Sequence, residues 1–249
     1  METVRRILRR DPFWSLYALG DLTPERLPYC HWLPNRDANA LVLLYSEFGT
    51  PILFADGDAA GVSEALYGVG LPTEVYLHIQ PDVLPAIEQH YRYAPLKPML
   101  RMALDPAALP AAALSADVLT MDDAPFVAEL YRDGEETGES PDFYFPQMLA
   151  EGAFHCLRVD GRLAAVAGTH VVNPAESIAA IGNVYTRRDC RNRGFGRVVT
   201  IAVARALMAR GIRTIGLNVY RENPARRIYE ALGFRHHCEF LEGPATLIS

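Results

Sequence analysis

The sequence of 249 residues contains no apolar run of the roughly 18 residues that a membrane span requires. Its first segment, Met1 to Asp21, has several arginines but no continuous apolar core of the kind found in secretion signals. Basic residues are outnumbered by acidic ones, and the formal net charge is -6. Overall charge therefore excludes general binding to nucleic acid or to an anionic membrane. We expect a cytoplasmic protein that has neither nucleic acid nor a membrane as a partner.

Cysteine is also scarce, and the four cysteines are scattered along the chain without paired spacing. A disulfide framework shows regular pairs, so we expect free thiols. The cluster His236-His237-Cys238 resembles a metal-binding motif. It lies on a predicted strand, however, where neighbouring side chains point to opposite faces and do not converge. We therefore expect no metal.

Apolar residues are abundant: they make up 50% of the chain, and charged residues make up 22%. This composition is typical of a folded globular protein. Helix-like and strand-like segments alternate from the start to Leu104, which predicts a mixed α/β fold. An Ala/Pro-rich segment, Asp105 to Leu114, is the predicted linker. We predict two domains, residues 1–110 and residues 116–249.

The second domain has the clearer order of elements. Asp160-Gly161 is typical of a two-residue hairpin turn, and a helix with an apolar stripe ends at Gly211. Asn223-Pro224 is typical of a helix start, with asparagine as the N-cap. The predicted elements are strands at 154–159 and 162–172, a strand at 177–186, a helix from about 197, a strand at 214–219 and a helix from 224.

A basic, glycine-containing loop joins the strand at 177–186 to the helix after it. The loop reads Arg191-Asn-Arg-Gly-Phe-Gly-Arg197. Amide groups at the start of a helix lack intrahelical partners, and the helix dipole favours an anion there. The glycines let the backbone approach a phosphate closely. The loop therefore predicts a local anion site in a protein that is acidic overall.

Two common nucleotide-binding loops do not fit these residues. A P-loop requires Gly-Lys followed by Ser or Thr, which the loop does not contain. A dinucleotide-binding loop requires Gly or Ala where Val199 stands, and an acidic residue about twenty positions later. Neither requirement is met.

Three motifs occur in a fixed order in this half of the chain. They are Arg191-x-x-Gly194-x-Gly196 after a strand, Asn223 with Tyr229 six residues later, and Leu232-Gly233-Phe234. The combination resembles the GNAT superfamily of acyl-CoA-dependent N-acyltransferases, over roughly Leu119 to the C-terminus. The resemblance implies a GNAT-like α+β mixed sheet there. Residues 1–110 resemble the GNAT-like or degenerate partner domain of two-domain members, including glycine N-acyltransferase-like proteins.

The resemblance also implies roles for individual residues, with acetyl-CoA as co-substrate. The strand backbone would bind the pantetheine arm, and the loop amides would bind the pyrophosphate. The implied cofactor contacts are Val184, Tyr185, Thr186, Arg191, Asn192, Arg193, Gly194, Phe195, Gly196, Arg197, Asn223 and Arg226. Tyr229 would donate a proton to the leaving CoA thiolate. Two alternatives remain, a helix cap at Asn223 and simple packing of Tyr229.

The implied reaction is N-acetyl transfer to a primary amine of a small molecule or peptide, by direct attack through a tetrahedral intermediate. A backbone N–H of the strand at 177–186 would hold the oxyanion. An alkyl amine with a pKa of about 10.4 is protonated at neutral pH, so a base must accept its proton. Some family members have a glutamate on this strand, but residues 178–184 contain none. Glu176, His170 and a base acting through water are open candidates.

Other functions remain open. The enzyme could transfer a longer acyl group to an amino acid such as glycine, or the protein could bind acyl-CoA without turnover, as a sensor. A nucleotide-binding module would require NAD or ATP to bind where CoA does not. The acidic segment 133–142 either attracts a cationic amine or is a solvated loop. The acceptor and the oligomeric state stay undetermined by the sequence.

Overall fold

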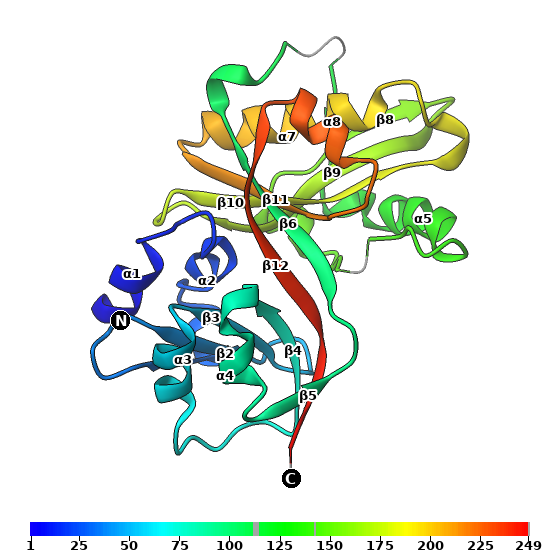
Figure 1. Ribbon diagram of the computed structural model, residues 1–249. Coiled ribbons are helices and arrows are strands. Elements are labelled where there is room, and N and C mark those ends of the chain that lie inside the picture. The colour runs from blue at the N-terminus through cyan, green and yellow to red at the C-terminus, as the bar shows by residue number, and fades with distance from the viewer. Residues whose placement is uncertain (112–114, 142, 249) are drawn as a thin grey trace. The chain divides into compact units, whose positions relative to one another are not determined.

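Figure 1 shows the computed structural model, which describes residues 1–111, 115–141 and 143–248. The chain divides into two compact units. The first unit comprises Met1–Arg101, Val219–Asn223 and His236–Ser249, and the second comprises Met102–Asn218 and Pro224–Arg235. These bounds differ from the predicted 1–110 and 116–249, because the last strand pairs within the first unit. Residues 112–114 of the predicted linker lie outside the described residues.

The first unit is built on a sheet in the order β1-β2-β3-β4-β12, with β5 also paired to β12. The β3–β4 pair is parallel, and α3 connects its two strands. The pairs β1–β2, β2–β3, β4–β12 and β5–β12 are antiparallel. Its elements are α1 (Glu2–Leu8), α2 (Leu16–Gly20), β1 (Cys30–Pro34), β2 (Leu41–Tyr45), β3 (Ile52–Asp56), α3 (Ala59–Leu66), β4 (Glu74–Ile79), α4 (Leu84–Ile87) and β5 (Tyr91–Tyr93). The chain then continues through β6 (Lys97–Leu104), and β12 (Phe234–Leu247) is its last strand.

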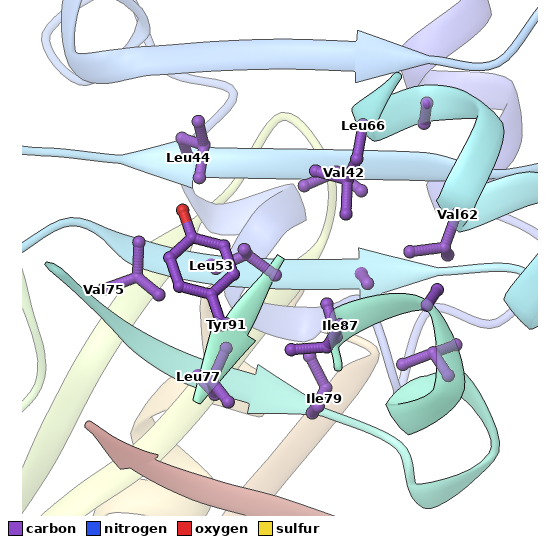
Figure 2. Close-up of a cluster of buried hydrophobic side chains, with 14 of the residues drawn as sticks. Val42, Leu44, Leu53, Val62, Leu66, Val75, Leu77, Ile79, Ile87 and Tyr91 are labelled. Carbon is purple, nitrogen blue, oxygen red and sulfur yellow. The ribbon is translucent and has the colours of Figure 1, made fainter. Parts of the chain in front are cut away.

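Apolar side chains cover both faces of this sheet. Helices α3 and α4 pack on one face, where Val42, Leu53 and Val62 belong to one buried cluster (Figure 2). The Asp58 carboxylate caps α3 by accepting a hydrogen bond from the N–H of Gly61 at 2.7 Å. Because side chains alternate along a strand, Phe54 faces away from this cluster, and its ring lies 5.2 Å from that of Trp14. The continuous apolar sequence of β2 is explained by burial on both faces.

A buried arginine lies on the Trp14 side of the same unit. The guanidinium of Arg101 lies 4.9 Å from the centre of the Tyr17 ring, and its Nη2 donates to His78 Nε2 at 2.8 Å. His78 Nδ1 lies 3.0 Å from Glu242 Oε1. Burial lowers the pKa of His78, so the neutral ring accepts from Arg101 and donates to Glu242. The imidazole thereby connects a buried positive charge to a carboxylate on β12.

The second unit contains a sheet in which β7, β8, β9 and β10 pair antiparallel and β10 pairs parallel with β11. Asp160 and Gly161 both have positive φ in the hairpin turn between β8 and β9. The elements are β7 (Asp117–Val118), α5 (Ala124–Glu135), α6 (Met148–Glu151), β8 (His155–Val159), β9 (Arg162–Asn173), β10 (Ile178–Thr186), α7 (Phe195–Ala209), β11 (Thr214–Tyr220) and α8 (Arg226–Ala231).

Helices lie on both faces of this sheet, with α7 on one side and α5 on the other (Figure 1). Val127 and Leu130 of α5 belong to a buried cluster with Phe154 and Val166. Helix α7 connects β10 to β11, as a parallel pair requires a crossover. The predicted mixed α/β fold is therefore confirmed.

Candidate functional site

The parallel strands β10 and β11 separate partway along their length. Their paired register begins at Ile178–Thr214 and ends at Ile181–Leu217. Strand β10 nevertheless continues to Thr186, and β11 continues to Tyr220. The backbone groups of β10 beyond Ile181 that face β11 therefore lack partners from that strand, and buried backbone groups need hydrogen bonds. An extended ligand with amide groups of its own can supply them, as an added strand would.

Two asparagines at this separation each hold a buried side-chain oxygen without a hydrogen-bond partner among the described residues. They are Asn183 on β10 and Asn218 on β11. Asn183 also has a φ of 54° at a bulge in the β9–β10 pairing, and its backbone carbonyl accepts from the Tyr131 hydroxyl at 2.8 Å. Leaving a buried acceptor unpaired is costly, so both oxygens suit a ligand that donates N–H groups.

The predicted anion loop lies between the end of β10 and the first turn of α7. Gly194 is the N-cap residue of α7 and has a φ of 77°, which favours glycine. The first helical bond runs from the Val198 N–H to the Gly194 carbonyl at 3.2 Å, so the amides ahead of Val198 are at the open helix start. A Cβ at Gly196 would lie 3.2 Å from Thr186 Oγ1. Glycine therefore lets the helix start approach the end of β10.

Arg191 connects this loop to β10 and to the acidic segment after α5. Its Nε donates to the Thr186 carbonyl at 3.3 Å, and its guanidinium lies 5.7 Å from the centre of the Tyr185 ring. Its two terminal nitrogens each lie 3.0 Å from a carboxylate oxygen of Glu139. The hydrogen bonds from Arg191 lower the pKa of Glu139, which keeps that exposed carboxylate charged.

Asp133, at the C-terminal end of α5, makes a second connection to this region. Its Oδ2 accepts from the Tyr185 hydroxyl and from the Arg188 backbone N–H, both at 2.9 Å. Burial alone would raise the pKa of Asp133, but the Arg188 amide and the Tyr185 hydroxyl outweigh it and lower the pKa. From its sequence, segment 133–142 is expected either to attract a cationic amine or to be a solvated loop. Neither interpretation predicts its contacts with the loop after β10. Asp142 lies outside the described residues.

The remaining basic residues of the site lie at the surface of the second unit. Arg193 and Arg197 are exposed, and the Arg193 guanidinium lies 4.6 Å from the centre of the Phe195 ring. Asn192 is exposed and has a φ of 61°. Arg226, on α8, donates from Nε to Glu230 at 2.7 Å. Exposed arginines around an open helix start add positive charge where an anion would bind.

Tyr229 lies on α8 and is half-buried, with its ring edge-on to that of Phe234 at 6.1 Å. Burial raises the pKa of Tyr229 to about 12, so its hydroxyl stays protonated at neutral pH. Helix α8 begins at Arg226 with Ala225 as N-cap. The expected helix-capping role of Asn223 is therefore wrong, and Asn223 belongs to the first unit.

The structure brings the β10 and loop residues together, because Arg191 contacts Thr186 and Tyr185 and the start of α7 lies against Thr186. Arg226 and Tyr229 both lie on α8, where Arg226 contacts Glu230 and Tyr229 contacts Phe234. Within the described residues, no group of His, Cys, Asp and Glu could hold a metal ion. None of the described helices has both the length and the apolar composition to cross a membrane.

Comparisons with known proteins bear on the fold and the family resemblance of the chain. The family model described as FR47-like protein, which is GNAT-related, matches residues 159–241. No curated protein matches the sequence. Among solved structures, a GCN5-related N-acetyltransferase from Kribbella flavida is similar, with a TM-score of 0.65 at 18% identity, covering 95% of this chain and 94% of that one.

Two further structures have the same fold. A GCN5-related N-acetyltransferase-like protein from Streptococcus suis has a TM-score of 0.56 at 14% identity, covering 99% of both chains. A GCN5-related N-acetyltransferase from Sphaerobacter thermophilus has a TM-score of 0.52 at 14% identity, covering 84% of this chain and 80% of that one. The chain therefore has the GNAT fold, and the predicted resemblance to that superfamily is confirmed.

Proposed function

We propose that the protein is an acyl-CoA-dependent N-acyltransferase that moves an acetyl group from acetyl-CoA to a primary amine of a small molecule or peptide. The observation that carries the proposal is the separation of β10 from β11 after Ile181–Leu217, next to the open helix start at Gly194. An acyl-CoA has an amide-containing arm, which matches the separated strands, and a pyrophosphate, which matches the open helix start. We assign its binding to residues 116–249.

In this proposal the arm of the co-substrate lies along Val184, Tyr185 and Thr186 and supplies the hydrogen bonds that β11 does not make. The amides of residues 192–197 at the start of α7 bind the pyrophosphate. Arg191, Arg193, Arg197 and Arg226 add positive charge, and Asn223 is a further proposed contact. The fit is supported by the two unpaired oxygens, Asn183 Oδ1 and Asn218 Oδ1, because pantetheine amides are donors.

The amine nitrogen attacks the thioester carbon, and a backbone N–H of β10 holds the oxyanion that forms. Collapse of the intermediate forms the amide and breaks the carbon–sulfur bond. Tyr229 is the proposed donor of a proton to the leaving thiolate. Its raised pKa keeps the proton in place before the reaction. A desolvated thiolate is also less stable, and this raises its own affinity for the proton.

Calorimetric titration with acetyl-CoA, CoA and ATP tests the first step. We expect acetyl-CoA and CoA to bind and ATP not to compete, because the loop lacks the residues of a P-loop. Release of CoA with a panel of amines then tests turnover. Binding of NAD or ATP in place of CoA would contradict the proposal.

Two alternatives share the cofactor site and differ in the fate of the bound acyl group. Transfer of a longer acyl group to an amino acid such as glycine would show as affinity that rises with acyl length. A sensor would bind acyl-CoA and release no CoA with any amine. The sensor alternative is favoured by one observation, the lack of a carboxylate between Ile178 and Thr186. If the protein is an enzyme, another group must accept the proton of the amine in place of that carboxylate.

A further inference from the structure

A histidine on β9 lies at an irregular point of the sheet. Ala180 pairs with Val171, but the next residue of β10, Ile181, pairs with Thr169. His170 is therefore the extra residue of a β-bulge. A bulge changes the direction of a side chain, and such features are frequent beside active sites. His170 is partly exposed, whereas Val171 and Thr169 on either side of it are buried.

The bulge directs the imidazole of His170 onto β10. A Cβ built at Gly182 would overlap the ring, with Nε2 the nearest atom. The ring therefore occupies the space that a side chain at position 182 would need, and only glycine leaves this space open. The ring of Phe143 lies edge-on to the imidazole at 5.8 Å and packs against it.

Gly182 is the residue directly after the last β10–β11 pair, Ile181–Leu217. The imidazole thus lies against β10 at the start of the separation between the strands. In the proposed function this is where the arm of the co-substrate enters and where the amine must approach the thioester. A residue on β10 itself cannot supply a carboxylate here, because residues 178–186 contain none.

We propose that His170 is the base of the reaction and that its Nε2 accepts the proton of the attacking amine. This inference rests on the proposed function. The nitrogen lone pair forms the carbon–nitrogen bond, one N–H proton passes to Nε2, and the carbon–sulfur electron pair leaves with sulfur. Tyr229 protonates that sulfur, and a proton returns from His170 to Tyr229 through solvent. The sum is amine plus thioester giving amide plus thiol.

The other titratable groups near β10 do not compete for this role. Glu176 lies in the turn before β10, and Ile178, the first residue of that strand, already precedes Gly182 by four residues, which is roughly 13 Å along a strand. Asp133 already accepts hydrogen bonds from Tyr185 and Arg188, near the opposite end of β10 from Glu176. Glu176→Gln is therefore a matched control that removes a carboxylate without changing the bulge.

The test compares wild type, His170→Gln and Glu176→Gln with two acceptors, an alkyl amine and an alkoxyamine that is neutral at neutral pH. We expect His170→Gln to lose roughly 100- to 10,000-fold in turnover of the alkyl amine. Its turnover of the alkoxyamine falls far less. The tetrahedral adduct of this weakly basic amine loses its proton to water without a base. Glu176→Gln keeps both activities. Calorimetric affinity for acetyl-CoA stays unchanged in both variants, which shows that the site is folded.

His170→Ala with added imidazole provides a second measurement. Free imidazole restores turnover of the alkyl amine if the ring acts as a base. Equal losses with both amines, without rescue by imidazole, would show a structural role and overturn the inference while leaving the proposed function intact. Unchanged turnover in His170→Gln would also overturn it. If wild type binds acetyl-CoA but acylates no amine, the proposed transfer fails and the role of His170 fails with it.

Discussion

Tyr229 on α8 is half-buried, and burial raises its pKa to about 12. A phenol with this pKa is protonated throughout the physiological range, so it can give up a proton but cannot act as a base. Its only neighbouring ring, within the described contacts, is that of Phe234. Removal of the hydroxyl should therefore change the chemistry much more than the packing.

We expect Tyr229→Phe to reduce kcat by roughly ten- to ten-thousand-fold, because the thiolate loses its proton donor. Affinity for acetyl-CoA, measured by calorimetry, should stay the same. Tyr67→Phe is the control, because Tyr67 is 86% exposed in the first unit and its hydroxyl has no proposed part in the reaction. Unchanged kcat in Tyr229→Phe would remove Tyr229 from the mechanism.

Asp21, at the end of α2, gives a prediction about pH and stability. Burial raises the pKa of Asp21 to about 7, with Arg26 opposing and Glu47 adding to the shift. An unfolded aspartate has a pKa of about 3.9, so between about pH 4 and pH 7 the folded state holds more protons. The free energy of unfolding therefore decreases as pH rises through this window.

We expect Asp21→Asn to increase the free energy of unfolding at pH 8 by about 1–3 kcal/mol and to change it little at pH 4. Urea denaturation at the two pH values measures the difference. Asp37→Asn, at an exposed turn in the same unit, is the control that removes a surface carboxylate. An equal shift of Asp21→Asn at both pH values would contradict the burial of a neutral carboxyl.

At the scale of elements, the site depends on how α7 begins. Gly194 has a φ of 77° and nothing within 4 Å of the place where a Cβ would be. Gly68 in the first unit has a φ of 70° and equally open surroundings. A side chain costs roughly 1–2 kcal/mol of backbone strain at either position, so the two glycines form a matched pair.

Gly194→Val should weaken acetyl-CoA binding by at least about tenfold, since the new side chain lies where the pyrophosphate must approach. Thermal unfolding should show that Gly68→Val loses as much stability as Gly194→Val. Its affinity for acetyl-CoA should stay unchanged. Calorimetry with both variants makes the comparison. Retained affinity in Gly194→Val would undercut the assignment of the loop.

The acidic segment after α5 gives a second prediction at this scale. Glu139 holds Arg191 through two bonds of 3.0 Å, and its negative charge lies next to the proposed phosphate site. Exposed ion pairs contribute up to about 1 kcal/mol. We expect Glu139→Gln to tighten acetyl-CoA binding about two- to fivefold at low salt, with Glu136→Gln as the exposed control. Weaker binding would show that the pair orders the loop instead.

For the whole molecule, the sequence predicts local features well and distant pairings poorly. The Asp160-Gly161 turn and the apolar stripe of α7 depend on neighbouring residues, and their elements lie within two residues of the predicted bounds. The pairing of Leu241 with Ile79 joins segments far apart in sequence. The bonds from Asp133 to Arg188 span 55 residues, and the bulge at His170 is a register shift that no alternation of residues indicates.

This distant pairing predicts the effect of a truncation. A chain that ends at Phe240 lacks the β12 residues that pair with β4, as well as the Glu242 carboxylate next to His78. Arg101 then keeps a buried charge without its balancing carboxylate, which is strongly destabilising. We expect proteases to cut the truncated chain within residues 1–101 while residues 120–218 stay protected. A synthetic peptide of residues 236–249 should restore protection. Protection without the peptide would contradict this account.

The pairing of β4 with β12 also bears on how the protein is made. Residues 1–101 leave the ribosome first, but the segment that completes their sheet, Leu241 to Thr246, is translated about 140 residues later. At about 5–20 residues per second this delay lasts roughly 7 to 28 seconds. Throughout that interval the outer edge of β4 is open to pairing with other nascent chains. Synthesis speed and chaperone supply should therefore influence the yield of this protein more than its final stability does.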